Sequence, residues 1–426
     1  MNYEESLRYI HSINWAFCKP GLERITKLCE ALGNPQDHLR FIHVAGTNGK
    51  GSTCAMLESI LRHAGYRTGL YTSPYIVSFN ERMRVNGENI DNDTLAEITT
   101  RIRPIADAME DKPTEFELIT AVAFEYFYRS GCDVVVLEVG LGGRLDSTNI
   151  IKNPLLSIIT GIDFDHTGLL GNTIQEIAVE KAGIVKEGCQ VLYGGVENAA
   201  CRTIRSITEH RHACFHTVDR SSYVKKSATL DGTVFDYLDY TDLKLSLLGA
   251  YQPYNATLVL TAIGLLTEQC GLVVPEDAIR EGLATVKWQA RFELLSDAPI
   301  ILYDGGHNPE GVNAAVKSIR EYFPEQKVLL LSGVMEDKDY DSMIEELKAV
   351  TAHAFTVTPD NPRALKAVEY ASAFRNHKVP ANAYESVEEG VRAAVEASRT
   401  ENIPLICLGS LYLYHDVADA VRRVLN

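Results

Sequence analysis

The apolar residues of this chain follow two alternating patterns, and their order predicts an α/β protein. Short apolar runs, typical of buried strands, alternate with segments in which apolar residues return every three or four positions, as on one face of a helix. Glycines separate many of these segments. We therefore expect a mostly parallel sheet covered by helices. The predicted strands are Phe41–Ala45, Arg67–Thr72, Asp133–Val139 and Leu155–Ile162, and the predicted helices are Tyr3–Ile13, Leu22–Leu32, Ser52–Ala64, Leu118–Arg129 and Thr173–Gly183.

The second half of the chain changes character twice. From His210 to Leu248, polar and apolar residues alternate, which predicts antiparallel strands in a smaller subdomain. Tyr254–Cys270 is again helical, and a fresh series of strands and helices begins at Ile300. We therefore expect two domains, residues 1–296 and residues 297–426, the second with a Rossmann-like α/β fold.

Composition narrows the classes of protein that fit this pattern. The 426 residues carry 41 Lys and Arg against 57 Asp and Glu, a net charge of −16, which argues against a general nucleic-acid-binding surface. No apolar run is long enough for a transmembrane helix, and Met1–Trp15 lacks the cationic start and apolar block of a secretory signal. The nine cysteines are scattered without a C-x-x-C pair, as expected of reduced thiols. We expect a cytoplasmic protein that binds neither nucleic acid nor membranes.

A glycine-rich loop follows the first predicted strand. Phe41–Ala45 runs into the sequence GTNGKGST and then into a helix. Glycines let successive N–H groups face an anion, the helix N-terminus adds positive potential, and Lys50 can neutralise phosphate oxygens. The strict G-x-x-x-x-G-K-[ST] pattern is not met, because Gly51 separates Lys50 from Ser52, and a plain surface turn is the alternative. The strand–loop–helix context favours ATP binding by the loop, whose residues are Gly46, Thr47, Asn48, Gly49, Lys50, Gly51 and Ser52.

Charged side chains also follow later strands and helices. Glu138 is the last residue of an apolar strand, and ligand sites in open α/β sheets lie beyond the carboxyl ends of strands. Glu138 is therefore placed to hold Mg²⁺ near the phosphates, with a solvated carboxylate as the alternative. His166 follows another strand, and Lys181 lies near the end of a helix. A lone His or Lys is usually structural, but the joint placement of these residues favours a shared site.

Seven sequence blocks together resemble one enzyme family. They are G-T-N-G-K-G-S, T-S-P, E-V-G-L-G-G-R-L-D-S-T-N, D-H, E-K-A-G-I, D-G-G-H-N-P and G-S-L-Y-L. In this order they are similar to folylpolyglutamate synthase/dihydrofolate synthase, the folate branch of the Mur ligase superfamily. The resemblance implies a Mur-ligase-like ATP-binding domain followed by a glutamate-ligase domain. It also implies an ATP-dependent ligase that adds L-glutamate to a folate or to dihydropteroate through an acyl phosphate.

The resemblance assigns residues to the nucleotide and metal sites. Lys181 resembles the lysine that CO₂ converts to a carbamate in this family, and a carbamate oxygen suits a metal where a cationic lysine does not. Two Mg²⁺ ions are implied. The implied metal ligands are Ser73, Glu138, His166 and carbamylated Lys181, and the implied nucleotide contacts outside the loop are Gln252, Asn255, Arg291 and Asp304.

The resemblance also assigns a substrate pocket. Thr114, Phe116 and Asp146 correspond to its pterin side, while His307 and Ser410 would face the incoming glutamate. Lys338 lies in a charge cluster after a predicted strand, so it is a further substrate candidate, with a solvated surface cluster as the alternative. We expect a monomer. The residues on which we expect the chemistry to depend are Lys50, Lys181, His166, Arg291 and, as a candidate base, His307.

Four blocks depart from the family pattern, and these departures bear on substrate preference. Tyr251 replaces the His of H-Q-x-x-N, and Ser147 replaces the Ala of D-A-T-N. The usual W-P-G-R is W-Q-A-R at Trp288–Arg291, and the usual D-G-A-H-N is D-G-G-H-N at Asp304–Asn308.

Two alternatives remain open from the sequence. One is a cell-wall Mur ligase, against which the extra Gly51 and the lack of a separate domain ahead of the loop both argue. The other is a P-loop NTPase that hydrolyses ATP without ligation.

Overall fold

The computed structural model describes residues 1–12 and 21–425, which form two compact units. Unit 1 comprises Met1–Ser221 and Asn255–Thr285, and unit 2 comprises Ser222–Tyr254 and Val286–Asn426. The predicted domain boundary at residue 297 lies inside the second unit and stays a prediction. The predicted helix Tyr3–Ile13 is present as α1 (Tyr3–His11), but Ile13 itself, and Trp15 and Cys18, lie outside the described residues.

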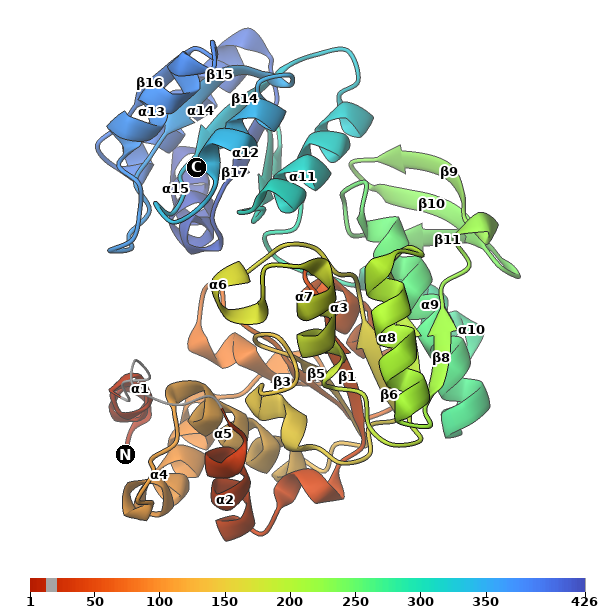
Figure 1. Cartoon of the computed structure of the whole chain (residues 1–426). Coiled ribbons are helices and arrows are strands. Elements are labelled where there is room, and N and C mark those ends of the chain that lie inside the picture. Colours follow the sequence, from red (N-terminus) through yellow and green to blue (C-terminus); the bar gives the residue numbers. More distant parts are fainter. Residues whose placement is uncertain (13–20, 426) are drawn as a thin grey trace. The chain divides into compact units, whose positions relative to one another are not determined.

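Unit 1 is built on a mixed, mostly parallel sheet. Among the described residues it has eight strands in the order β4-β3-β2-β5-β1-β6-β7-β8, and only β3 and β4 run antiparallel to their neighbours. The predicted α/β sheet is thereby confirmed. Figure 1 labels β1, β3, β5, β6 and β8 of this sheet. The strands are β1 (Phe41–Ala45), β2 (Thr68–Tyr71), β3 (Met83–Val85), β4 (Glu88–Asn89), β5 (Val134–Glu138), β6 (Leu156–Ile159), β7 (Gln190–Tyr193) and β8 (Cys214–Thr217).

Two groups of helices cover one face of this sheet. Phe41, Val135 and Leu137 pack with apolar residues of α1, α2, α4 and α5, while Ala45 and Ile159 pack with α7 and α8. The strand pairing puts all five on the same face. The remaining helices of unit 1 are α2 (Glu23–Ala31), α3 (Lys50–His63), α4 (Asn92–Ala108), α5 (Glu115–Arg129), α6 (Thr167–Leu170), α7 (Ile174–Ala182), α8 (Ala199–His210), α9 (Gln252–Cys270, which begins in unit 2) and α10 (Glu276–Thr285).

Local sequence signals set the ends of these helices. After α2, Gly33 and Asn34 take left-handed conformations with φ of 89° and 55°, and Pro35 opens the next turn, so the predicted helix stop is confirmed. At the start of α5 the Thr114 hydroxyl accepts a hydrogen bond from Glu117 N, and Thr114 N donates to the Glu117 carboxylate. Such a capping box satisfies N–H groups that the first helical turn leaves unpaired.

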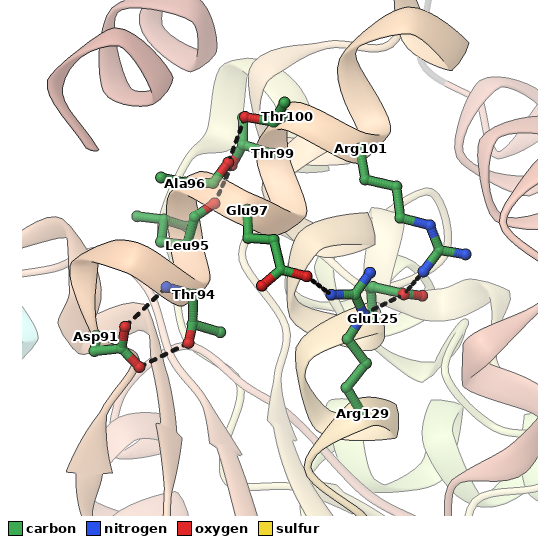
Figure 2. Close-up of polar contacts among 10 residues, drawn as sticks. All are labelled: Asp91, Thr94, Leu95, Ala96, Glu97, Thr99, Thr100, Arg101, Glu125 and Arg129. Carbon is green, nitrogen blue, oxygen red and sulfur yellow. Dashed lines mark hydrogen bonds and ion pairs between the residues drawn. The ribbon is translucent and has the colours of Figure 1, made fainter. Parts of the chain in front are cut away.

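A buried carboxylate joins α4 to α5 (Figure 2). Glu125, whose side chain is 2% exposed, accepts hydrogen bonds from Arg101 of α4 and, at 2.7 Å, from Nε of Arg129. Arg129 also donates to Glu97 at 2.7 Å, and the Glu97 side chain is 73% exposed. Two guanidinium groups therefore compensate for the burial of one carboxylate.

Replacing Glu125 with glutamine is expected to lower the free energy of unfolding by about 2 kcal/mol, because a buried amide pairs less well with two guanidinium groups. The control is Glu97→Gln, which removes an exposed ion pair and should change stability by less than about 0.5 kcal/mol. Urea unfolding of both variants measures the two values. If the two variants lose the same unfolding free energy, the burial of Glu125 does not add to the strength of its ion pairs.

Unit 2 contains two further sheets. The predicted antiparallel strands are confirmed as a three-stranded sheet in the order β11-β10-β9. The second sheet has six strands in the order β12-β13-β17-β14-β15-β16, all parallel except β12 at its edge. The strands are β9 (Val224–Thr229), β10 (Gly232–Tyr237), β11 (Tyr240–Leu245), β12 (Glu293–Asp297), β13 (Ile300–Asp304), β14 (Val328–Ser332), β15 (Thr351–Thr356), β16 (Ala381–Ala383) and β17 (Leu405–Leu408).

Helices pack onto this second sheet around one apolar core. Leu302, Leu330 and Ile406 of its strands pack with buried residues of α11, α12 and α13. The repeated strand–helix order confirms the predicted α/β character of this region. The helices are α11 (Pro309–Tyr322), α12 (Tyr340–Leu347), α13 (Ala367–Asn376), α14 (Val387–Glu401) and α15 (Tyr414–Leu425).

One part of the antiparallel prediction is wrong. The region that starts at His210 was expected to be antiparallel throughout, but Cys214–Thr217 forms β8, which pairs parallel with β7 at the edge of the first sheet. The preceding α8 is long enough to connect two parallel strands. Because α8 contains many polar residues, the apolar pattern of the sequence did not predict this helix.

Two further findings concern thiols and membranes. Every cysteine in the described residues is a free thiol, as predicted. None of the described helices combines the length and the apolar character that crossing a bilayer requires.

Candidate active site

Four neighbouring parallel strands of unit 1 end at one edge of the sheet. The register pairs Tyr71 with Leu137, Val44 with Glu138 and Ala45 with Ile159, so β2, β5, β1 and β6 stop almost level. The residues that follow these strands must therefore lie close together. The backbone N–H of Ser73 donates to Glu138 Oε2 at 3.1 Å, and Glu138 is 4% exposed. The sheet thus brings together two of the predicted metal ligands.

The loop after β1 is held tightly against the segment that follows β6. Gly46 has φ of 145°, and a Cβ on it would lie 1.9 Å from Thr160 Oγ1, so only glycine fits. Thr47 N donates to Gly161 O at 2.9 Å, and Thr160 Oγ1 donates to Asn48 O at 2.6 Å. A loop that approaches its neighbour this closely is pre-shaped rather than mobile, as phosphate binding through N–H groups requires.

The loop ends in the first turn of α3. Gly49, with φ of 83°, is the residue before the helix, and α3 begins at Lys50. Lys50 Nζ donates to the carbonyl oxygens of Gly46 and Thr47, both at 3.1 Å, so the cation lies over the loop. Gly51 and the buried Ser52 lie within the first helical turn. The N-terminus of α3, the ammonium of Lys50 and the glycine-rich loop therefore lie together, as a phosphate-binding site requires.

Asn255 lies against the same loop. A Cβ on Gly49 would lie 2.8 Å from Asn255 Oδ1. Gln252, three residues earlier, is fully buried at the start of α9. Residues three apart share a helix face, so the two predicted nucleotide contacts lie on one side of α9.

Lys181 is buried near the end of α7, 4% exposed, and its ammonium donates to Gly46 O at 2.8 Å. Burial, and next the nearby charge of Lys50, lowers the pKa of Lys181 to about 7. No carboxylate in the described part of the chain forms an ion pair with it. The charge of Asp165 favours the ammonium, but burial and Lys50 outweigh it, and a buried amine of lowered pKa beside the phosphate loop is a reactive group.

His166 lies on the segment after β6, with φ of 49° and an imidazole that is 48% exposed. Its Nε2 is 3.7 Å from Asp165 Oδ2. Within the described ranges no three His, Cys, Asp or Glu side chains gather into a group that could hold a metal ion. The predicted donor set therefore depends on the hydroxyl of Ser73 and on a carbamate at Lys181 in addition to Glu138 and His166. Hydroxyl, carboxylate and carbamate oxygens suit Mg²⁺, so these residues fit the ion only when Lys181 is carbamylated.

Phe116 and Asp146 lie together beside Gly140, two residues after Glu138. A Cβ on Gly140 would meet the Phe116 ring at 2.5 Å and Asp146 Oδ2 at 3.2 Å, so both side chains border one glycine. Asp146 is 6% exposed and accepts from Leu141 N at 2.9 Å, and burial raises the pKa of its carboxyl group. Thr114, the third predicted pterin-side residue, caps α5 with its hydroxyl.

The predicted residues of unit 2 gather around the end of β13. Asp304, 3% exposed, accepts from Tyr251 Oη at 2.7 Å, Phe292 N at 3.0 Å and Gly306 N at 2.8 Å. Burial raises the pKa of the Asp304 carboxyl group. Arg291 packs beside Gly305, where a Cβ would lie 2.7 Å from Arg291 Nη1. From the sequence, Tyr251 was notable only because it replaces the His of the family's H-Q-x-x-N block. The structure shows that its hydroxyl is a hydrogen-bond donor to Asp304.

His307 and Ser410 belong to the same unit. His307 Nδ1 lies 3.0 Å from Gly305 O, so it donates there and the neutral ring carries its lone pair on Nε2. Ser410 follows β17, is 2% exposed, and its hydroxyl accepts from Tyr412 N at 3.2 Å. Lys338 is half-buried after β14, with its backbone in a turn with Met335. The parallel register of β13, β17 and β14 places all three chain segments at one sheet edge.

This combination of phosphate loop, strand-end acid and second α/β unit defines a Mur ligase. The Mur ligase middle domain matches residues 44–263, and the Mur ligase glutamate ligase domain matches residues 290–411. Dihydrofolate synthase/folylpolyglutamate synthase of Bacillus subtilis is 36% identical over 430 residues, which cover 99% of each chain. The chain therefore belongs to the folylpolyglutamate synthase/dihydrofolate synthase family, and it is an ATP-dependent ligase that adds glutamate to folates or dihydropteroate.

Solved structures agree with this assignment. The crystal structure of folylpolyglutamate synthase from Thermotoga maritima has a TM-score of 0.87 and 32% identity, over 99% of this chain and 96% of that one. Escherichia coli FolC in complex with DHPP and ADP has a TM-score of 0.87 and 29% identity, over 100% of this chain and 99% of that one. The predicted family is thus confirmed against the cell-wall ligase and the NTPase without ligase activity.

Proposed function

We propose that this chain phosphorylates the terminal carboxylate of dihydropteroate or of a reduced folate with ATP and couples it to the α-amine of L-glutamate, using the residues described above. The observation that carries the proposal is the convergence of the Gly46 loop, Lys181 and Glu138 at the carboxyl edge of one sheet. Escherichia coli FolC, a similar protein, was crystallised with DHPP and ADP, which supports a site for a pterin compound beside a nucleotide. We further propose that the protein acts as a cytoplasmic monomer.

In this proposal the nucleotide is held by the loop from Gly46 to Ser52, with Lys50 neutralising phosphate charge. Gln252 and Asn255 contact the nucleotide from α9. Arg291 and Asp304 are the further proposed nucleotide contacts. Ser73, Glu138, His166 and carbamylated Lys181 would hold Mg²⁺, which would supply positive charge against the negative charge of phosphoryl transfer.

Carbamylation of Lys181 follows from its surroundings. The ammonium first loses a proton to solvent. The neutral amine then attacks the carbon of CO₂, a C–N bond forms as one C=O π bond opens, and a second proton leaves to solvent, so that a cation is replaced by a carbamate anion. A buried ammonium beside Lys50 is unfavourable, which keeps part of the lysine neutral and able to react. The anion produced is a hard oxygen ligand of the kind that Mg²⁺ prefers.

The chemistry proceeds in two displacements. A carboxylate oxygen of the folate attacks the γ-phosphorus of ATP and ADP leaves, giving an acyl phosphate. The amine nitrogen of glutamate then attacks the acyl carbon, inorganic phosphate leaves, and a base accepts the amine proton. Lys50 and Arg291 offset negative charge in the first step. His307, which donates from Nδ1 and so accepts at Nε2, is the proposed base in the second.

Separate sets of residues are proposed for the pterin and for the glutamate. Phe116 and Asp146 provide an aromatic face and a hydrogen-bond acceptor for the pterin ring, and Thr114 holds the start of α5 in place beside them. His307, Ser410 and Lys338 would receive the glutamate, whose two carboxylates need donors and a cation.

The test is an ATP-dependent assay with labelled glutamate, in which dihydropteroate and tetrahydrofolate are supplied separately. Incorporation into one or both, with one phosphate released per glutamate added, is the expected result. Phosphate release that does not depend on folate and glutamate, or incorporation into neither compound, would overturn the proposal. The ratio of kcat/KM for the two compounds then identifies the preferred substrate.

A further inference from the structure

His43 is a fully buried histidine in the middle of β1, three residues before the Gly46 loop. Its neighbours in the register are Leu137 and Ser157, and the strand is otherwise apolar. Burial, and next the charge of Lys186, lowers the pKa of His43 to about 3, so the imidazole is neutral at any working pH. A buried polar ring in an apolar strand is unfavourable unless it hydrogen-bonds, and the reaction proposed above does not use it.

His43 makes its hydrogen bond to Thr148, a residue that in turn binds Asp146. His43 Nε2 lies 2.9 Å from Thr148 Oγ1, and Thr148 Oγ1 lies 2.5 Å from Asp146 Oδ1. Thr148 N also donates to Asp146 Oδ1 at 3.0 Å. Thr148 is fully buried, so no water competes for its hydroxyl. The three side chains form one continuous chain from β1 to the proposed pterin site.

The chemistry of the three groups fixes the direction of this chain. Burial raises the pKa of the Asp146 carboxyl group, but each of its oxygens accepts from a backbone N–H, Oδ2 from Leu141 N and Oδ1 from Thr148 N. These bonds favour the ionised form, which accepts from the Thr148 hydroxyl as well. Thr148 has one hydroxyl proton, which it gives to Asp146. Its oxygen must therefore accept from His43, which requires the tautomer protonated on Nε2.

This arrangement constrains where the carboxylate of Asp146 points. Without His43, the hydroxyl of Thr148 could rotate about its C–O bond, and only the hydrogen bond from Thr148 N would still hold Asp146 Oδ1. With His43 in place, Oδ1 faces the buried chain, and Oδ2 stays on the side of Leu141 N and the Phe116 ring. The orientation of the acceptor offered to a pterin then depends on a residue that touches no substrate.

We propose that His43 is a positioning residue for the pterin substrate, acting through Thr148 to hold Asp146 in its binding orientation. The inference rests on the proposed function in one respect, namely that Asp146 contacts the pterin. Because β1 also leads into the phosphate loop, one strand supports both the nucleotide site and the pterin site.

Three substitutions at His43 test this. The amide nitrogen of glutamine lies as many bonds from Cα as Nε2 of histidine, whereas that of asparagine corresponds to Nδ1. We expect His43→Leu and His43→Asn to raise KM for the pterin substrate about tenfold, the effect of losing one buried hydrogen bond. The KM for ATP and kcat should change less than about threefold. His43→Gln, which restores a donor at the right place, should recover KM to within about threefold of the wild type.

Thr148→Val provides an independent test that leaves β1 intact. It should raise KM for the pterin substrate as much as His43→Leu does, and the double variant should be no worse than either, because both break the same chain. The matched control is Thr208→Val, which removes an equally buried hydroxyl that bonds only within α8, and its KM values should stay at the wild-type level.

The outcome for Asp146→Asn separates the two hypotheses. If Asp146→Asn leaves KM for the pterin substrate unchanged, the proposed role of Asp146 fails. If it raises that KM while His43→Leu and Thr148→Val do not, the positioning role of His43 is wrong. Equal increases in KM for ATP, glutamate and the pterin substrate in His43→Leu, or no recovery in His43→Gln, would also overturn the inference.

Discussion

Replacing Lys181 with alanine is expected to lower kcat for glutamate addition by at least about 1,000-fold, the scale on which loss of a central electrostatic group acts. The amine is buried, lies 2.8 Å from Gly46 O in the phosphate loop, and is the only predicted ligand that CO₂ could convert from a cation into an anion. Its loss would remove a proposed metal ligand and the hydrogen bond to Gly46 O. The measurement is labelled-glutamate incorporation at saturating substrates.

Two further variants show whether the carbamate is responsible. Lys181→Arg keeps the charge but cannot react with CO₂, and it should be as inactive as Lys181→Ala. Lys186→Ala is the matched control, since Lys186 is a half-buried lysine nearby that donates to Asn149 O at 2.8 Å and whose pKa burial lowers to about 8. It should retain activity within about threefold.

The carbamate itself can be observed directly. In ¹³C-bicarbonate buffer the wild type should give a carbamate NMR signal that Lys181→Ala lacks. Since only the neutral amine reacts, and the pKa of Lys181 is about 7, the signal should weaken as the pH falls below 7. Wild-type turnover by Lys181→Arg, or the same NMR signal in Lys181→Ala, would contradict the role of the carbamate.

The second large effect is expected at Glu138. Glutamine has the shape of glutamate without its charge, so Glu138→Gln keeps a side-chain oxygen that can accept from Ser73 N and removes the carboxylate from the proposed metal site. We expect kcat to fall about 100-fold to 1,000-fold and the Mg²⁺ concentration for half-maximal activity to rise at least about tenfold. Mg²⁺ titration of the steady-state rate measures both.

Glu58→Gln is the control for this substitution. Glu58 of α3 is also buried, 5% exposed, but it pairs with Arg62 and Thr68, both at 3.0 Å. Its substitution should lower stability and leave the Mg²⁺ dependence unchanged. An unchanged Mg²⁺ requirement in Glu138→Gln would rule out Glu138 as a metal ligand.

Much of this architecture was predictable because its signals are local. The strand Phe41–Ala45, the glycines after it and the helix from Lys50 carry their conformations in adjacent residues, and β1 and α3 follow them closely. Glu138 was predictable for a similar reason, since the last residue of a parallel strand lies at the ligand-binding edge wherever the strand lies in the sheet.

Other features had no local signal. Cys214–Thr217 is short and exposed, and only its hydrogen bonds to β7 make it a parallel edge strand. Tyr251 looked like a departure from the family pattern, and only the structure shows that its hydroxyl donates to Asp304, 53 residues later. His43 looked like one polar residue in an apolar strand, because its partner Thr148 lies 105 residues away.

The order of apolar and polar residues was thus enough to determine the α/β class, and the glycines after β1 were enough to determine the loop, because periodicity and glycine positions act between near neighbours in the chain. The family was predicted from the resemblance of seven sequence blocks. Only the tertiary structure decided how acidic, basic and hydroxyl groups pair. It buried Lys181 beside Gly46 and linked His43 to Asp146. Burial and hydrogen bonding depend on residues far apart in the chain, and they set the charge state and direction of the groups that do the chemistry.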